Sequence, residues 1–144
     1  MLSKSRPHPD QCGFSSASAA SGVDEESTAP ILGQFIRIEL PTGEPLTLSE
    51  VEVFSDGRNV AADGTATQSS TGWGGVPERA IDGNTHPSYS SGTQSHTAEG
   101  QARAWWELDL GSPTPIDAIT IWGRQEGPYG KRLDGHTIRV LSAD

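Results

Sequence analysis

The sequence predicts an all-β domain, either a sandwich or a barrel. Apolar residues alternate with polar residues in several short segments, and turn-forming residues separate these segments. Alternation with a period of two is typical of half-buried strands, whereas the 3.6-residue period of a helix is almost absent. Many short strands with almost no helix favour two packed sheets or a closed barrel.

Residues 1–33 differ from the rest of the chain in composition. They are rich in Ser, Ala, Pro and Gly and show neither period. Such a segment can bury little apolar surface, so we expect a disordered leader or linker here. Residues 34–144 are numerous enough for one domain with a single core.

The expected strands follow one another along this domain. Residues 35–40 and 46–54 alternate clearly, with a turn rich in Pro and Gly between them. Three later strands are expected at residues 105–110, 116–122 and 136–141. Each is bounded by Gly, Pro or charged residues, which favour turns.

Less regular elements lie between these strands. Residues 60–62 and 66–71 predict a short strand and a Ser/Thr run, and residues 72–75 predict a flexible loop that carries Trp73. Residues 76–81 predict a single helical turn with Pro77 at its start, where the missing N–H costs nothing. We expect Gly111 to end the strand before it.

The net charge narrows the class of ligand. Lys and Arg number 10 and Asp and Glu number 19, which gives a formal charge of −9. Phosphate groups would be repelled, so nucleic acid and anionic lipid are poor partners. The acidity suits a hard cation such as calcium.

Few signals in the sequence bear on location. The single cysteine, Cys12, allows no internal disulfide and therefore does not indicate a redox compartment. No apolar run approaches the ~20 residues of a membrane helix, so we expect no membrane insertion. Lys4 and Arg6 are not followed by an apolar segment, so no signal peptide is predicted. Either the protein is not exported by that route, or the chain is a fragment or has an incomplete start.

A long polar stretch, residues 79–96, stands out. It contains Asp82-Gly83-Asn84 and a run of Ser and Thr, and it ends on His96. Structured polar loops of this length are often functional. The alternatives are a plain tight turn for Asp-Gly-Asn and a solvated surface side chain for His96. Our hypothesis is that a metal holds this loop and that the loop presents His96 to a ligand.

Several phrases of the sequence, taken in order, resemble a known family. They are Asn59-Val-Ala, Ala66-Thr-Gln-Ser-Ser, Ala80-Ile-Asp-Gly-Asn84, Ser95-His-Thr97, Trp105-Trp-Glu-Leu-Asp-Leu-Gly111, an Ile-rich strand ending in Arg124, and Lys131-Arg-Leu-Asp-Gly135. Together they resemble the F-type lectin (fucolectin) family, within the discoidin group that includes the C domains of coagulation factors V and VIII. The resemblance covers about residues 35–144.

The resemblance implies a jelly-roll β-sandwich of about eight strands with a ligand site formed by loops at one end. Members of the family bind fucose-bearing glycans and hold their loops with one calcium ion. They are not enzymes. The resemblance also implies a location outside the cell or at the cell surface.

The family's sugar-binding pattern maps onto four residues. His96 takes the place of the family histidine, and Arg124 and Arg132 take the places of its basic residues. Glu126 stands where the family has an Asp that orients the arginines, so its role would be indirect. An arginine fork can bridge neighbouring hydroxyls, which suits a sugar. Without the resemblance, the two arginines are ordinary surface charges or partners of Asp134.

A sugar also has an apolar face, which an aromatic side chain can cover. Tyr129 and Trp73 are the candidates for this contact. Trp105 and Trp106 are neighbours on one expected strand, so at most one of them points to the core. We expect both to serve in packing.

By the same resemblance, the calcium ligands are oxygens of the polar stretch: the side chain of Asp82, the carbonyls of Arg79 and Asn84, and the carbonyl and hydroxyl of Thr93. The family completes its shell from a Cys/Ser-Glu-Val-Glu-Val phrase that usually lies near the C-terminus. Here this phrase begins early, at Ser49-Glu50. Because the two ends of such a sandwich are neighbours, a permuted order is sterically possible. We therefore expect the Ser49 carbonyl and the Glu50 carboxylate as ligands.

The leading interpretation is a calcium-stabilised carbohydrate-binding module for fucose or a related sugar on glycans. Single sites of this kind bind weakly, which favours a larger or multivalent assembly. The alternative is a discoidin-type adhesion or interaction module that binds protein or lipid without sugar specificity. An enzyme is the third reading, but no nucleophile–base pair or open zinc site stands out.

Overall fold

The computed structural model describes residues 15–16, 29–86, 92–125 and 130–143. Its strands are β1 (Ser15–Ser16), β2 (Ile31–Leu40), β3 (Thr47–Ser55), β4 (Arg58–Asn59), β5 (Thr65–Gln68), β6 (Ser95–His96), β7 (Ala104–Ile116), β8 (Ala118–Gly123) and β9 (Thr137–Leu141). Two short 3₁₀ helices, η1 (Ala61–Asp63) and η2 (Pro77–Ile81), lie between strands. The described residues include no helix that is long and apolar enough to cross a membrane.

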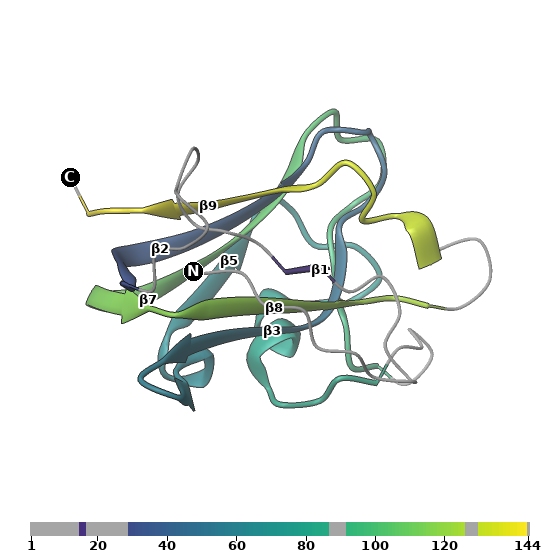
Figure 1. Cartoon of the computed structure of the whole chain (residues 1–144). Helices are drawn as coiled ribbons and strands as arrows, with labels where there is room; N and C mark the ends of the chain where they lie inside the picture. The colour runs from purple at the N-terminus through teal and green to yellow at the C-terminus, as the bar shows by residue number, and fades with distance from the viewer. Residues whose placement is uncertain (1–14, 17–28, 87–91, 126–129, 144) are drawn as a thin grey trace.

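The strands form two antiparallel sheets that pack face to face (Figure 1). One sheet has the order β1-β8-β3-β4, with β6 added beside the beginning of β3. The other has the order β5-β7-β2-β9. Except for the hairpin of β3 and β4, neighbours in each sheet come from distant parts of the chain, as in a jelly roll. The expected all-β sandwich is therefore confirmed.

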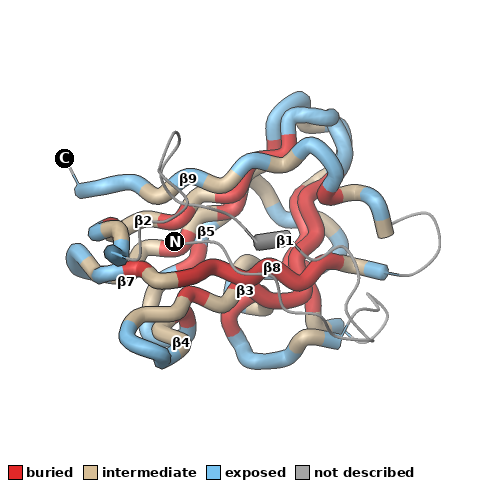
Figure 2. The backbone as a smooth tube through the Cα atoms, viewed as in Figure 1, coloured by how far each residue is buried: buried red, intermediate tan, exposed pale blue. Residues whose placement is uncertain are grey.

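The core lies between the two sheets. Ile36 and Ile38 of β2 and Trp106 of β7 are fully buried, and Val51 and Ile121 meet them from the other sheet. Burying a side chain of this size contributes about 1.5–3 kcal/mol. The middles of the strands are buried, whereas most connecting loops are exposed (Figure 2). The loops at the sandwich ends are thus free to carry function.

Strand β7 is longer than the sequence predicts. Gly111 does not end it, and the strand continues to Ile116. Its pairing with β2 shifts register between Gly33 and Phe35, so extra residues of β7 are accommodated as a bulge. Gly111 adopts a φ of 87°, which a residue without a side chain reaches at little cost. The expected stop was wrong because the turn-forming residues make a bulge instead.

The beginning of the domain also differs from the expectation. β2 starts at Ile31, ahead of the expected boundary at residue 34. Ser15 and Ser16 pair with Ile121 and Thr120 of β8, so part of residues 1–33 joins a sheet. The segments 1–14 and 17–28 lie outside the described residues, and the expected leader remains a prediction for them.

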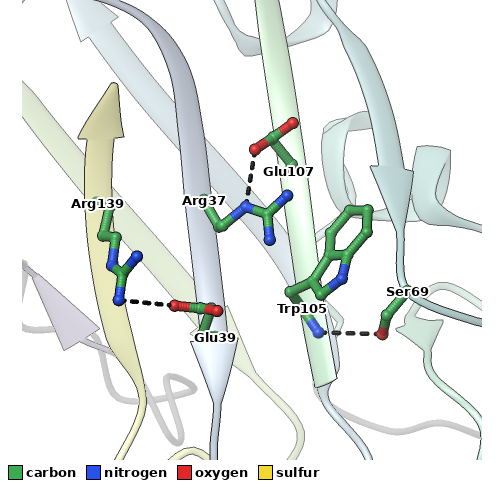
Figure 3. A network of polar contacts seen from close by, with 6 residues as sticks. All are labelled: Arg37, Glu39, Ser69, Trp105, Glu107 and Arg139. Carbon is green, nitrogen blue, oxygen red and sulfur yellow. Dashed lines mark hydrogen bonds and ion pairs between the residues drawn. The ribbon is translucent and has the colours of Figure 1, made fainter. Parts of the chain in front are cut away.

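The outer face of the β5-β7-β2-β9 sheet is polar and aromatic (Figure 3). Arg37 Nε donates to Glu107 Oε2 at 2.8 Å, and the guanidinium lies 4.2 Å from the centroid of the Trp105 ring. Trp106 points the opposite way, into the core. The two tryptophans therefore serve in packing on opposite faces, as expected.

Candidate functional site

Three segments meet at the beginning of β3. Leu48 pairs with Ser95 of β6 on one side and with Gly123 at the end of β8 on the other. Between Leu48 and Glu50 the register with β8 shifts, so β3 is irregular at this point. This arrangement places the end of the polar stretch and the residue that precedes Arg124 on either side of β3.

His96 is held firmly at this junction. Its Nδ1 lies 2.8 Å from Thr47 Oγ1. Its backbone N–H donates to the Gly75 carbonyl at 2.9 Å, and its carbonyl accepts from the Gly72 N–H at 2.9 Å. The residue is only 2 % exposed. A ligand would therefore contact the ring at its rim, or after a shift of the side chains around it.

The turn that carries Trp73 is attached to His96 through those two backbone bonds. Trp73 has a φ of 54° and is 76 % exposed at the tip of the turn. A Cβ added at Gly75 would lie 2.7 Å from the His96 N and Cβ atoms. Only glycine therefore allows this close approach. The structure thus brings an exposed indole to the same junction as His96.

Arg124 and Arg132 lie near His96 as well. Burial lowers the pKa of His96 to about 4, and the positive charges of Arg132 and then Arg124 add to this effect. The imidazole is therefore neutral at neutral pH. Arg132 is mostly buried, and its Nε lies 3.7 Å from Glu44 Oε2.

The structure thus gathers three of the residues expected to bind sugar, His96, Arg124 and Arg132, from three separate segments. Glu126 and Tyr129 lie outside the described residues, and their expected roles remain predictions.

Glu50 lies in the same irregular part of β3. It is 2 % exposed, and its Oε2 accepts a hydrogen bond from the Gly83 N–H at 2.9 Å. Its Oε1 is buried and accepts no hydrogen bond from the described part of the chain. Burial raises the pKa of Glu50 to about 8, against the effect of the Gly83 N–H, and the charges of Asp82 and Glu52 raise it further. A carboxylate in such a place is costly unless a positive charge joins it.

The loop opposite Glu50 is tightly turned. The Asn84 N–H donates to Asp82 Oδ1 at 3.0 Å, and the His86 N–H donates to Asn84 Oδ1 at 3.0 Å. These Asx turns use one side-chain oxygen of Asp82 and one of Asn84, and they do not involve the backbone carbonyl of Asn84. The loop has the tight-turn geometry that the sequence left open as an alternative, and it also faces a buried carboxylate.

The other expected cation ligands lie close by in the fold. Thr93 Oγ1 donates to the His86 carbonyl at 3.4 Å, and an Arg79 NH group donates to the Gln94 carbonyl at 3.5 Å. Ser49 precedes Glu50 in β3, and its hydroxyl donates to the Gly123 carbonyl at 3.2 Å. Among the described residues, no group of three or more His, Cys, Asp or Glu side chains lies where it could hold a metal ion. A cation here would have to be held by the Glu50 carboxylate together with oxygens of the loop, which is the kind of ligand set that calcium accepts.

The family match follows the same region of the chain. Residues 64–143, more than half of the sequence, match the F5/8 type C domain family. The chain belongs to this family.

Individual relatives of this F5/8 type C domain include several fucolectins. Fucolectin-5 of Anguilla japonica is 39% identical over 87 residues, which are 57% of this chain and 45% of that protein. Fucolectin of Anguilla anguilla is 36% identical over 87 residues, 57% of this chain and 54% of that protein. A pentraxin fusion protein of Xenopus laevis is 34% identical over 84 residues, 58% of this chain and 20% of that protein. The chain spans about half the length of the fucolectins that it matches. The resemblance inferred from the sequence is confirmed.

Two residues at the candidate site of this F5/8 type C domain were not predicted from the sequence. Thr47 contacts the His96 ring, although 49 positions separate the two residues. Gln94 is 0 % exposed and lies between Thr93 and β6. The only feature of the sequence that could have indicated Gln94 is its position, since it is a polar residue two positions before His96. The alternation along β3 places Thr47 on the face opposite Leu46 and Leu48. This pattern does not indicate which side chain Thr47 contacts.

Proposed function

We propose that this domain is a non-catalytic, calcium-stabilised carbohydrate-binding module for fucose or a related sugar on glycans. The observation that carries the proposal is the meeting of His96, Arg124 and Arg132 at one junction. A neutral imidazole near two guanidinium groups suits a sugar, because the guanidinium groups donate hydrogen bonds to hydroxyls and the imidazole has one donor and one acceptor nitrogen. The names of the fucolectin relatives support fucose as the first sugar to test.

A bound calcium ion would supply a fixed positive charge that neutralises Glu50 and Asp82 and holds the loop between residues 82 and 86. Glu50, Asp82 and the carbonyls near Thr93 are the groups that would hold it. The Glu50 Oε1 atom supports this part of the proposal, because it is buried with no hydrogen bond from the described residues. Fucolectin-like function further favours an extracellular location and an assembly that presents several sites.

Sugar binding is tested by titrating methyl α-L-fucoside into the wild type and the Arg124→Ala variant, with a glycan array to define specificity. Hydrogen bonds from a charged donor contribute about 1.5–3 kcal/mol each, so we expect affinity to fall about tenfold or more. Arg139→Ala is the matched control. Arg139 is an exposed arginine of β9 that pairs with Glu39 at 3.3 Å, and its loss should leave affinity unchanged. Equal affinity of wild type and Arg124→Ala would contradict the proposed site.

A second candidate function is adhesion to a protein or lipid surface. The exposed Trp73 at the tip of its turn favours it, because indoles are frequent anchors at interfaces. Flotation with zwitterionic phosphatidylcholine vesicles tests the lipid case. Binding that Trp73→Ala abolishes and that free fucose does not inhibit would favour adhesion over sugar recognition.

A further inference from the structure

Gln94 is a buried amide at the centre of the junction. It is 0 % exposed, and its Nε2 donates to Ser49 Oγ at 2.8 Å and to the His86 carbonyl at 3.2 Å. The contact with Ser49 is buried and the contact with His86 is partly buried, so both are costly to lose. The side chain therefore ties the polar loop to the beginning of β3.

The orientation of this amide follows from its partners. The Ser49 hydroxyl has one hydrogen, which it donates to the Gly123 carbonyl at 3.2 Å, so toward Gln94 it acts as an acceptor. The His86 carbonyl is also only an acceptor. Both neighbours need the NH₂ group of Gln94, and a flipped amide would place its oxygen against them. The result is one directional relay from Gln94 through Ser49 to Gly123.

The hydrogen bonds of Gln94 and Ser49 connect the two halves of the proposed site. On one side, His86 ends the turned loop that starts at Asp82 and faces Glu50. On the other side, Gly123 directly precedes Arg124, and Gln94 lies two residues before His96. A shift of Ser49 or of the loop therefore acts on the backbone that carries the sugar-binding side chains.

We propose that Gln94 is a positioning residue that couples occupancy of the cation site to affinity for the sugar. The inference rests on the proposed function of the two half-sites and adds the route that connects them. The Glu50 carboxylate and the Ser49 carbonyl would hold the cation, and Ser49 would then be restrained. Through its hydrogen bonds with Gln94 and Gly123, Ser49 would in turn restrain the backbone before His96 and Arg124. By linkage, the sugar must raise the affinity for the cation by the same factor.

The Gln94→Met variant tests this coupling, because it keeps the volume of the side chain and removes both donated hydrogen bonds. Calcium binding is measured by calorimetry, and methyl α-L-fucoside is titrated with saturating calcium and with chelator. In the wild type we expect calcium to raise sugar affinity about tenfold, within the usual range of allosteric coupling. In Gln94→Met we expect this factor to fall below about twofold while calcium still binds.

Gln34→Met is the matched control. Gln34 Nε2 donates to Asp109 Oδ1 at 3.1 Å on the other sheet, so this variant should keep the wild-type coupling factor. If Gln94→Met fails to fold, Ser49→Ala replaces it, since it removes the middle hydroxyl of the relay and keeps the Ser49 carbonyl. A wild-type coupling factor in the variant would overturn the proposal.

A readout without sugar separates this inference from the proposed function. Backbone amide resonances of His96 and Arg124 are followed by NMR during a calcium titration. Shifts that occur in the wild type and vanish in Gln94→Met support the coupling even if the fucoside does not bind. Equal shifts in both proteins overturn the coupling alone. If calcium does not bind the wild type, the cation part of the proposed function fails and the coupling fails with it.

Discussion

His96 is the residue whose ionisation the fold changes most clearly in the candidate sugar site. Burial, with Arg132 and Arg124 nearby, lowers its pKa to about 4. The folded protein therefore binds fewer protons at His96 than the unfolded chain between that value and the ordinary value of 6.5. The contribution of His96 to the free energy of unfolding is lost as the pH falls through this window.

We expect the His96 ring to titrate with a midpoint near pH 4 in NMR spectra of the folded protein. Arg132→Ala should raise the midpoint, because it removes a positive charge that disfavours the imidazolium. Arg139→Ala, which removes an exposed charge on β9, should leave it unchanged. A midpoint near 6.5 would show that the ring is solvated and not enclosed at the junction.

At the scale of elements, the turn at residues 72–75 and strand β6 depend on each other. The turn bonds to both backbone groups of His96, and Gly75 leaves no room for a side chain there. The obstructing atoms belong to the His96 backbone and Cβ, so they cannot move aside as the end of a flexible side chain could. The turn and the strand must therefore separate if Gly75 gains a Cβ.

We expect Gly75→Ala to lower the free energy of unfolding by about 1–3 kcal/mol, the usual cost of overpacking. Sugar affinity should fall as well, because His96 moves with β6. Urea denaturation and a fucoside titration measure the two effects. Ala62→Gly, at an exposed position of η1 remote from β6, is a control for a small change of volume, and it should leave sugar affinity unchanged. Unchanged stability of Gly75→Ala would contradict the tight contact.

The elements differ in how far the sequence predicts them, and the reason is the range of the interactions. The alternation around Ile36, Ile38 and Val51 is local, and it correctly assigned strands and their buried faces. Strand β6 has only two residues and exists because Thr47 and Leu48 pair with it. The bulge at Gly111 depends on the register with β2. Neither feature has a local signal.

The same distinction applies to the candidate site. The family resemblance named His96, Arg124 and Arg132, and the fold brings them near one another. The family resemblance also named Glu50, whose carboxylate accepts a hydrogen bond from Gly83, 33 positions away in the sequence. The supporting contacts of Gln94 depend on partners 45 positions away, so no short motif could show them.

For the whole molecule, Glu50 connects stability to calcium and to pH. Its pKa of about 8 means that, without a cation, the folded protein holds a proton that the unfolded chain releases above the ordinary value of 4.5. The contribution of Glu50 to stability is therefore lost as the pH rises through this window. Calcium would replace that proton and reverse the loss.

We expect calcium at a hundredfold excess over its dissociation constant to stabilise the wild type by about 2.7 kcal/mol at pH 8. Glu50→Gln should lose this stabilisation, and in chelator it should be as stable as the wild type or more stable. Glu99→Gln is the control, because Glu99 is exposed and is not among the charges that raise the pKa of Glu50, so it should leave the calcium response intact. Thermal melts with calcium and with chelator measure the effect. An undiminished calcium response in Glu50→Gln would remove this residue from the ligand set.

The short strand β1 has a further consequence. In the order β1-β8-β3-β4, it pairs with Thr120 and Ile121 of β8, where the sheet edge would otherwise be open. Unpaired N–H and C=O groups on such an edge are a template for strands of other chains. A shortened domain that begins at residue 29 would expose the groups of Thr120 and Ile121 that Ser15 and Ser16 now occupy. Ser15 and Ser16 thus occupy backbone groups of β8 that a strand of another chain could otherwise pair with.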